Sequence, residues 1–202
     1  LPTSFADFLI GHVAAKVAQK TEQNIWNGAA ATNGEFAGFK ELMLADADVV
    51  DIAAVGGGID ATNIIAQLGS VVDTINANLY SSEDMLIYVS QNVARAYVRA
   101  LGGFSVAATS NSGTDDKGTQ WFSGQALTFD GVKIAVANGL PNNTMVAAEK
   151  SNLFFGTGLL SDQNEVKVID MADIDGSQNV RVVMRFTAGV QYGIGSDIVL
   201  YS

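Results

Sequence analysis

The chain has 202 residues and a formal net charge of −10, because 21 Asp and Glu residues outweigh 11 Lys and Arg residues. With 48% hydrophobic and only 16% charged residues, it can bury a large core, which excludes an intrinsically disordered protein. Its negative charge excludes long-range attraction of the whole protein to nucleic acids or anionic membranes. There is no Cys, one His and no apolar run near the roughly 20 residues that span a bilayer, which excludes disulfides, multi-His metal sites and transmembrane segments.

The first predicted element is a helix over residues 4–27. Its apolar residues from Phe5 to Val17 recur three or four positions apart, which is typical of one helical face. Ser4 is expected to cap the start of the helix. Asn27-Gly28 is expected to end it, because both residues tolerate the left-handed backbone of a helix terminus.

Between the first and second helices the chain is predicted to be irregular or extended. Residues 28–38 are mostly small and indicate a loop, and residues 42–55 place Asp among apolar residues as an extended or mixed segment does. Gly56–Gly58 then precedes a strongly amphipathic helix, with Asp60 or Thr62 as its N-cap. The apolar side of this helix is expected to carry Ile64, Ile65, Leu68, Val71, Val72, Ile75 and Leu79.

A strand and a third helix are predicted next. The run Met85–Val89 is almost wholly apolar and suits a strand that is buried on both faces. Ser90 is expected to cap a helix that Gly102-Gly103 ends, with Arg95 and Arg99 one turn apart on its outer side. The order helix, strand, helix describes an α/β unit. The inward positions of the third helix are Val93, Tyr97, Val98 and Leu101.

The second half of the chain is predicted to consist mainly of strands. Residues 109–118 indicate a long polar loop, and residues 138–143 indicate a second loop. Asp130-Gly131 lies between two apolar runs and predicts a hairpin, since both positions tolerate a positive φ. The fold class is therefore α+β or mixed α/β. The predicted strands are 127–129, 132–137, 145–148, 152–155, 166–170, 180–187 and 198–201.

No catalytic, cofactor-binding or metal site is predicted. Gly56–Gly58 lacks the Lys-Ser/Thr pair of a phosphate-binding loop, and a hinge is the favoured interpretation. His12 is the only imidazole, and a packed, hydrogen-bonded helical residue is favoured over a catalytic or metal-binding role. Asp170, Asp173 and Asp175 form only part of a calcium loop, and a solvated turn is favoured. A hydrolase or ligand-binding domain that uses scattered carboxylates remains an alternative.

Several segments nevertheless occur in a recognisable order. They are the helix over 5–24 with Ile25-Trp26-Asn27-Gly28, the α/β unit over 61–101, the run from Leu127 to Pro141, and the strands within 145–157 and 180–192. In this order they resemble the major capsid protein of tailed bacteriophages, which has the Hong Kong 97 fold. The resemblance covers the carboxyl-terminal portion of that protein, from its spine helix onward.

The resemblance implies a division into two domains. A peripheral domain with a long spine helix and β-strands is expected to comprise residues 1–54 and 141–202, and an axial α/β domain inserted between them residues 55–140. The family's N-terminal arm and extended hairpin loop are not seen before the helix, so a larger parent chain is expected. We expect that these 202 residues alone do not form closed shells.

The resemblance also implies a function without catalysis. We expect a structural capsid protein that self-assembles into the hexamers and pentamers of an icosahedral shell enclosing DNA. It would bind no cofactor, membrane or specific nucleic acid, and its partners would be copies of itself and scaffold, portal or decoration proteins. Its location would be the virion capsid, assembled in the bacterial host cytoplasm. An encapsulin-like nanocompartment shell protein is the alternative with the same fold.

The candidate contacts between subunits are charged residues. Arginine donates two parallel hydrogen bonds to a carboxylate, so Arg side chains suit pairing with acidic neighbours. Arg181 and Arg185 share one face of their predicted strand. Solvation, or pairing within one subunit, is the alternative for each residue. The candidates are Arg95, Arg99, Asp115, Asp116, Arg181 and Arg185.

Overall fold

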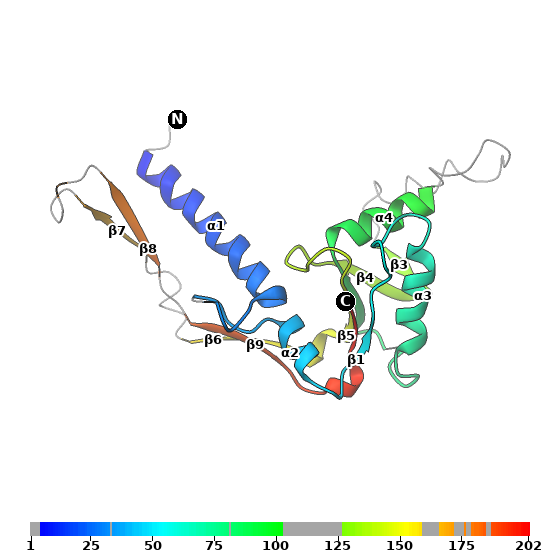
Figure 1. Cartoon of the computed structure of the whole chain (residues 1–202). Coiled ribbons are helices and arrows are strands. Elements are labelled where there is room, and N and C mark those ends of the chain that lie inside the picture. The colour runs from blue at the N-terminus through cyan, green and yellow to red at the C-terminus, as the bar shows by residue number, and fades with distance from the viewer. Residues whose placement is uncertain are drawn as a thin grey trace.

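The computed structural model describes residues 5–32, 34–80, 82–102, 127–158, 166–171, 176, 179–184 and 187–202. These residues form four α-helices and ten strands, which confirms the predicted α+β class. Figure 1 shows an elongated arrangement, in which α3 and α4 lie with one sheet at one end while α1 and two small sheets extend away from it. The helices are α1 (Phe5–Asn27), α2 (Phe39–Ala45), α3 (Ile64–Thr74) and α4 (Gln91–Gly102).

A six-stranded sheet with the order β1-β10-β5-β2-β4-β3 is the centre of the fold. β1 pairs with β10 and β2 with β4 in parallel, and the other pairs are antiparallel. Three of its strands lie within residues 55–140 and three lie outside, so the sheet draws on both predicted domains; that division stays a prediction. The strands are β1 (Val50–Ile52), β2 (Met85–Val89), β3 (Thr128–Phe129), β4 (Val132–Val136), β5 (Met145–Glu149) and β10 (Val199–Tyr201).

The sheet separates two buried clusters of apolar side chains. In β5, Met145 and Ala147 face the first cluster, whereas Val146 and Ala148 face the second, because side chains alternate along a strand. The first cluster includes the apolar sides of α3 and α4, and the second includes α2 and the end of α1. All four of these β5 side chains are fully buried. Both faces of the central strand are therefore covered.

Two small antiparallel sheets complete the fold. One pairs β6 (Leu153–Thr157) with β9 (Ala188–Tyr192), and the other pairs β7 (Val166–Asp170) with β8 (Val180–Met184). In Figure 1 both lie on the same side of the molecule as α1. The predicted hairpin between β3 and β4 is confirmed, because Asp130 and Gly131 have φ values of 46° and 83°.

The second helix, α2, was not predicted. It covers Phe39–Ala45, whereas no element was predicted for residues 39–41 and an extended or mixed segment was predicted from residue 42 onward. Phe39 and Met43 are both buried, so packing against the sheet stabilises seven residues whose own pattern is too short to indicate a helix. Only the end of the predicted extended segment is a strand, at β1.

The helix α3 begins and ends differently from its prediction. Its N-cap is Asn63. Asp60 lies three residues earlier, and its carboxylate accepts hydrogen bonds from the N–H groups of Thr62 and Asn63 at 2.8 and 3.1 Å. The helix ends at Thr74, before Ile75 and Leu79. Ile65 was expected on the apolar side, but it is 44% exposed.

The end of α1 at Asn27 is confirmed, but the reason given for it was wrong. Gly28 does not have a left-handed backbone. A Cβ atom at this position would instead collide with the carbonyl oxygens of Phe36 and Asn24. The glycine is therefore needed because the following loop approaches the helix closely. Ser4, the predicted cap, lies outside the described residues.

Candidate functional site

The structure gives no sign of a catalytic or metal centre in the part of the chain that it describes. No three His, Cys, Asp or Glu side chains gather there to hold a metal ion. Two open hollows flank the second half of α1, with volumes of about 510 and 470 Å³. Amide side chains dominate the lining of the first hollow and make up four of the ten residues that line the second, and Asn138 contributes to each. Neither lining includes Ser, Thr, Cys, Tyr or His, so neither holds a hydroxyl or thiol nucleophile beside a base.

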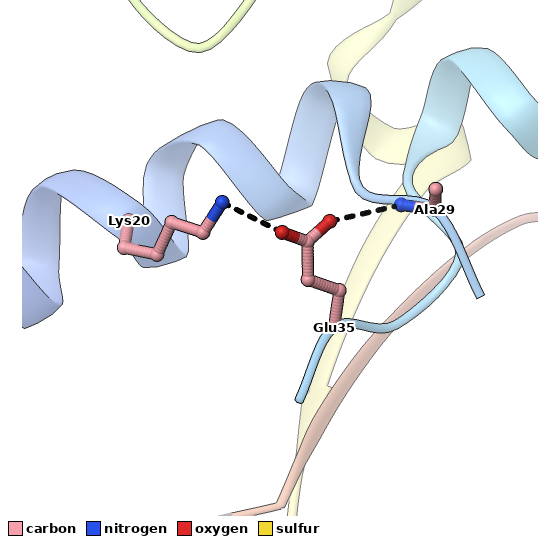
Figure 2. A network of polar contacts seen from close by, with 3 residues as sticks. All are labelled: Lys20, Ala29 and Glu35. Carbon is pink, nitrogen blue, oxygen red and sulfur yellow. Dashed lines mark hydrogen bonds and ion pairs between the residues drawn. The ribbon is translucent and has the colours of Figure 1, made fainter. Parts of the chain in front are cut away.

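The loop after α1 is held closed by polar contacts. Its two ends are joined by a hydrogen bond from the N–H of Gly38 to the carbonyl of Gly28 at 2.9 Å. Figure 2 shows Glu35 between Lys20, at 2.6 Å, and the N–H of Ala29, at 3.3 Å. The hydrogen bond from Lys20, and then that from Ala29, lower the pKa of the Glu35 carboxyl. Glu35 and Ala29 are thus held against α1 beside one hollow.

A second polar contact joins α2 to β9. The hydroxyl of Tyr192 donates a hydrogen bond to Asp46 Oδ2 at 2.8 Å. Burial, and then the hydrogen bond to Asp46 and the charge of that carboxylate, raise the pKa of Tyr192 to about 12. Hydrogen bonds from the N–H of Asp48 and from Tyr192 lower the pKa of Asp46. This contact fixes one end of the β6–β9 sheet to the rest of the fold.

We predict that this contact makes stability depend on pH in the alkaline range. Between the ordinary tyrosine pKa of 10.0 and the value of about 12, the folded state keeps a proton on Tyr192 that the unfolded state has lost. Stability therefore falls as pH rises through this interval. Tyr192→Phe should cost about 1–3 kcal/mol near neutral pH, and this difference should shrink toward pH 12. Urea unfolding of both proteins at several pH values checks it, and a constant difference would contradict it.

The structure places the candidate contact residues on separate surfaces. Arg95 and Arg99 are both exposed on α4, one turn apart as predicted, and Arg181 is exposed on β8. The Lys20–Glu35 contact is the ion pair found among the described residues, so these arginines make none within that part of the chain. Asp115, Asp116 and Arg185 lie outside the described residues, as do the loop over 109–118, Asp173 and Asp175.

His12 does not have the packed position that was expected for it. It is exposed on α1, and its ring stacks on Phe8 with the centroids 6.2 Å apart. Phe8 is itself 62% exposed. Phe8 and His12 therefore face solvent in the single chain, whereas Trp26 in the last turn of the helix lies in the second cluster.

A set of exposed large apolar side chains, which no sequence pattern indicated, is the most distinctive feature of the surface. A strand was predicted over residues 152–155. Phe154 and Phe155 are adjacent in it and point to opposite faces, and no pattern indicated that both are exposed. Single exposed apolar side chains are common on protein surfaces, so only those that lie next to one another indicate an interaction site. The exposed residues include Phe8, Leu44, Tyr80, Phe154, Phe155, Val168, Val180 and Ile194.

Comparison with known proteins connects this fold to viral shells. No protein-family model and no curated protein matches the chain. Among solved structures, it is similar to a protein of Mycobacterium phage Che8, with a TM-score of 0.61 and 16% identity over 98% of this chain and 63% of the other. It is also similar to a chain of the satellite phage P4 procapsid, with a TM-score of 0.60 and 10% identity over 99% of this chain and 67% of the other.

A third similar structure is a virus-like particle from Pyrococcus furiosus, with a TM-score of 0.50 and 11% identity over 92% of this chain and 63% of the other. These matches confirm the predicted resemblance in fold to tailed-phage major capsid proteins. The chain spans a little under two thirds of the Che8 protein's length.

Of the helices that the structure describes, none is both long enough and apolar enough to span a bilayer.

Proposed function

We propose that this chain is the carboxyl-terminal portion of a major capsid protein of a tailed phage or prophage. In this role it assembles with copies of itself into the hexamers and pentamers of an icosahedral shell that encloses DNA. The observation that carries the proposal is the similarity of nearly the whole chain to shell proteins, at 98–99% coverage, although sequence identity is only 10–16%.

The surface of the chain supports this role. Exposed apolar side chains occur on α1, β6, β7 and β8, and Figure 1 shows these elements extending away from the six-stranded sheet. An elongated subunit with apolar groups along its length can bury them only against other molecules. Its net charge of −10 disfavours binding to packaged DNA, so the proposed shell encloses DNA without binding a specific sequence.

The proposal includes the finer assignments that follow from the resemblance. Residues 1–54 and 141–202 form the peripheral domain, and residues 55–140 form the axial domain. The protein has no enzymatic activity and no cofactor. Beyond copies of itself, its partners are scaffold, portal or decoration proteins, and it resides in the virion capsid after assembly in the cytoplasm of a bacterial host.

Electron microscopy of the full-length parent protein tests the proposal most directly. We expect closed icosahedral shells or flat hexameric sheets, because identical subunits associate through repeated, symmetry-related contacts. A protein that stays strictly monomeric at high concentration would contradict the proposal. Portal and terminase genes beside the parent gene are the expected genetic context of a phage shell.

A nanocompartment shell without a phage is the second candidate. The similarity to the virus-like particle from Pyrococcus furiosus favours it, since that assembly is not named as a phage. Shells that contain protein cargo, with no portal gene nearby, would identify the second candidate. Shells that contain DNA would identify the first.

Arg95 and Arg99 provide a prediction within this function. If α4 faces an acidic neighbour in the shell, the double variant Arg95→Glu with Arg99→Glu places like charges in contact, which costs several kcal/mol. We expect the yield of shells to fall at least about tenfold, since 1.4 kcal/mol is a tenfold change. Both side chains are exposed, so the thermal midpoint should change little.

The control variant is Lys133→Glu with Lys150→Glu, which changes the net charge by the same amount at exposed positions on other elements. Light scattering and electron microscopy of both double variants measure assembly. Equal losses in the two variants would show a general charge effect and would contradict a contact at α4.

A further inference from the structure

The β6–β9 sheet has an outer face without charged residues. Leu153 and Tyr192 lie opposite each other and point inward, and Tyr192 belongs to the second buried cluster. Because side chains alternate, the opposite face carries the pairs Phe154 with Gln191 and Gly156 with Gly189. We call these four residues the outer face of the sheet. Phe154 is 55% exposed on it.

The two facing glycines leave a notch beside Phe154. A Cβ atom on Gly189 would have no other atom within 4 Å, and one on Gly156 would meet only the Gly189 carbonyl at 3.9 Å. Neither glycine has a positive φ. The fold of the single chain therefore does not require glycine at either position. Glycine weakens a strand, and in a strand it often marks a close approach by another backbone or a ligand.

Hydrogen bonds between the Asn152 side chain and the backbone keep this uncharged surface in place. The side chain of Asn152 accepts hydrogen bonds from the N–H groups of Gly193 and Ile194 at 3.0 and 2.9 Å, and donates one to the carbonyl of Ile194 at 2.8 Å. This clamp closes the end of the sheet next to Phe154. Phe154 is thus presented on a preorganised strand, which lowers the entropy cost of binding.

The absence of charge on this sheet allows a second copy of this chain to be the partner. Two copies of a protein with a net charge of −10 repel each other wherever acidic side chains face each other. The ten residues of β6 and β9 include no Asp, Glu, Lys or Arg. Two outer faces can therefore meet without opposing like charges.

Geometry makes the outer face self-complementary. Phe154 and the Gly156–Gly189 notch are two residues apart along β6, which is about 6.6 Å. A twofold contact brings the same patch of both copies together, so a projection and a notch on one face can fill each other twice. We propose that the outer face binds the outer face of a second copy, with each Phe154 ring seated over the Gly156–Gly189 pair of its partner.

The contact is too small to hold two copies together by itself. Two five-residue strands cover roughly 17 by 10 Å, far less than the roughly 800 Å² per partner of a stable complex. The contact cannot hold a dimer alone, so it operates beside other contacts between copies. The inference therefore rests on the proposed shell function and names one of its subunit contacts.

Phe154→Ala in the full-length protein tests the projection, with Phe155→Ala as the matched control. The two residues are neighbours of the same type, 55% and 47% exposed, and point to opposite faces of the sheet. We expect Phe154→Ala to raise the protein concentration needed for assembly about tenfold or more, and Phe155→Ala to change it less than about threefold. Equal effects would overturn the inference.

Gly189→Val tests the notch. The open space around Gly189 and the strand preference of valine predict an unchanged or higher thermal midpoint. The valine side chain should nevertheless block assembly as strongly as the loss of Phe154, because it fills the space for the partner's ring. A well-folded Gly189→Val protein that assembles normally would overturn the inference.

A crosslink locates the contact directly, because the chain has no Cys. Phe154→Cys and Gly189→Cys proteins, carrying different tags, are mixed at a concentration high enough for the Phe154→Cys protein to assemble, and are then oxidised. We expect a disulfide between the two tagged chains. Assembled shells without this disulfide would overturn the contact and leave the shell function intact, whereas a parent protein that never assembles would contradict the shell function itself.

Discussion

Replacement of Trp26 by alanine is expected to lower the free energy of unfolding by about 3–5 kcal/mol. Trp26 is only 6% exposed, and its ring lies 5.4 Å from the ring of Phe39 and 5.1 Å from that of Tyr88. It therefore joins α1, α2 and β2 at one point. The alanine variant loses this apolar contact and leaves a cavity that three separate elements cannot close together.

Urea unfolding followed by near-ultraviolet circular dichroism measures this loss. Leu44→Ala is the control, because Leu44 lies on α2 but is 52% exposed. We expect Leu44→Ala to change the free energy of unfolding by less than about 0.5 kcal/mol. If Trp26→Ala were as stable as Leu44→Ala, Trp26 would not join α1 to the sheet.

Gly139→Ala is expected to destabilise the protein through a clash rather than a cavity. Gly139 lies in the loop between β4 and β5, and its backbone approaches α1 closely. A Cβ atom there would collide with the carbonyl oxygen of Glu22 and lie 2.8 Å from Trp26 Cδ1. Backbone atoms cannot turn away as a flexible side chain can, so the loop or the helix must shift. We expect a loss of about 1–3 kcal/mol or more.

Gly69→Ala is the matched control for this substitution. Gly69 lies within α3, and a Cβ atom there would have no other atom within 4 Å. Alanine is favoured over glycine inside a helix by about 1 kcal/mol, so this variant should be more stable than the natural chain. The two substitutions add the same methyl group, and thermal unfolding should show shifts of opposite sign. A stabilising effect of both would contradict the close approach of the loop to α1.

The elements with strong local patterns were predicted correctly. The periodicity of α1, α3 and α4 indicated helices because each has an apolar side, and the apolar run of β2 indicated a buried strand. Asp130-Gly131 specified the β3–β4 hairpin through its backbone preference alone. The helix α2 was missed because its seven residues are too few for a periodic pattern, and buried Phe39 and Met43 stabilise it only in the folded chain.

The positions of Arg95 and Arg99 on α4 were predicted correctly, and their role as contacts between subunits stays a prediction. The spacing of Arg95 and Arg99 was sufficient to place them together on the outer side of α4. The outer face of the β6–β9 sheet was not found, because its two strands are separated by thirty residues between Thr157 and Ala188. Which residues share that face depends on the register between these strands, and no local signal fixes a register over that distance.

The sequence by itself determined that the chain folds with a large core, that it carries no recognisable catalytic motif, and in which order its helices and strands occur. These properties depend on composition and on spacing within single elements. Tertiary structure alone decided that strands from both ends of the chain share one sheet, that α1 leaves Phe8 and His12 exposed, and that Phe154 stands beside a glycine notch. Each of these results depends on pairing between distant segments, which is set by the burial of the whole chain rather than by any segment of it.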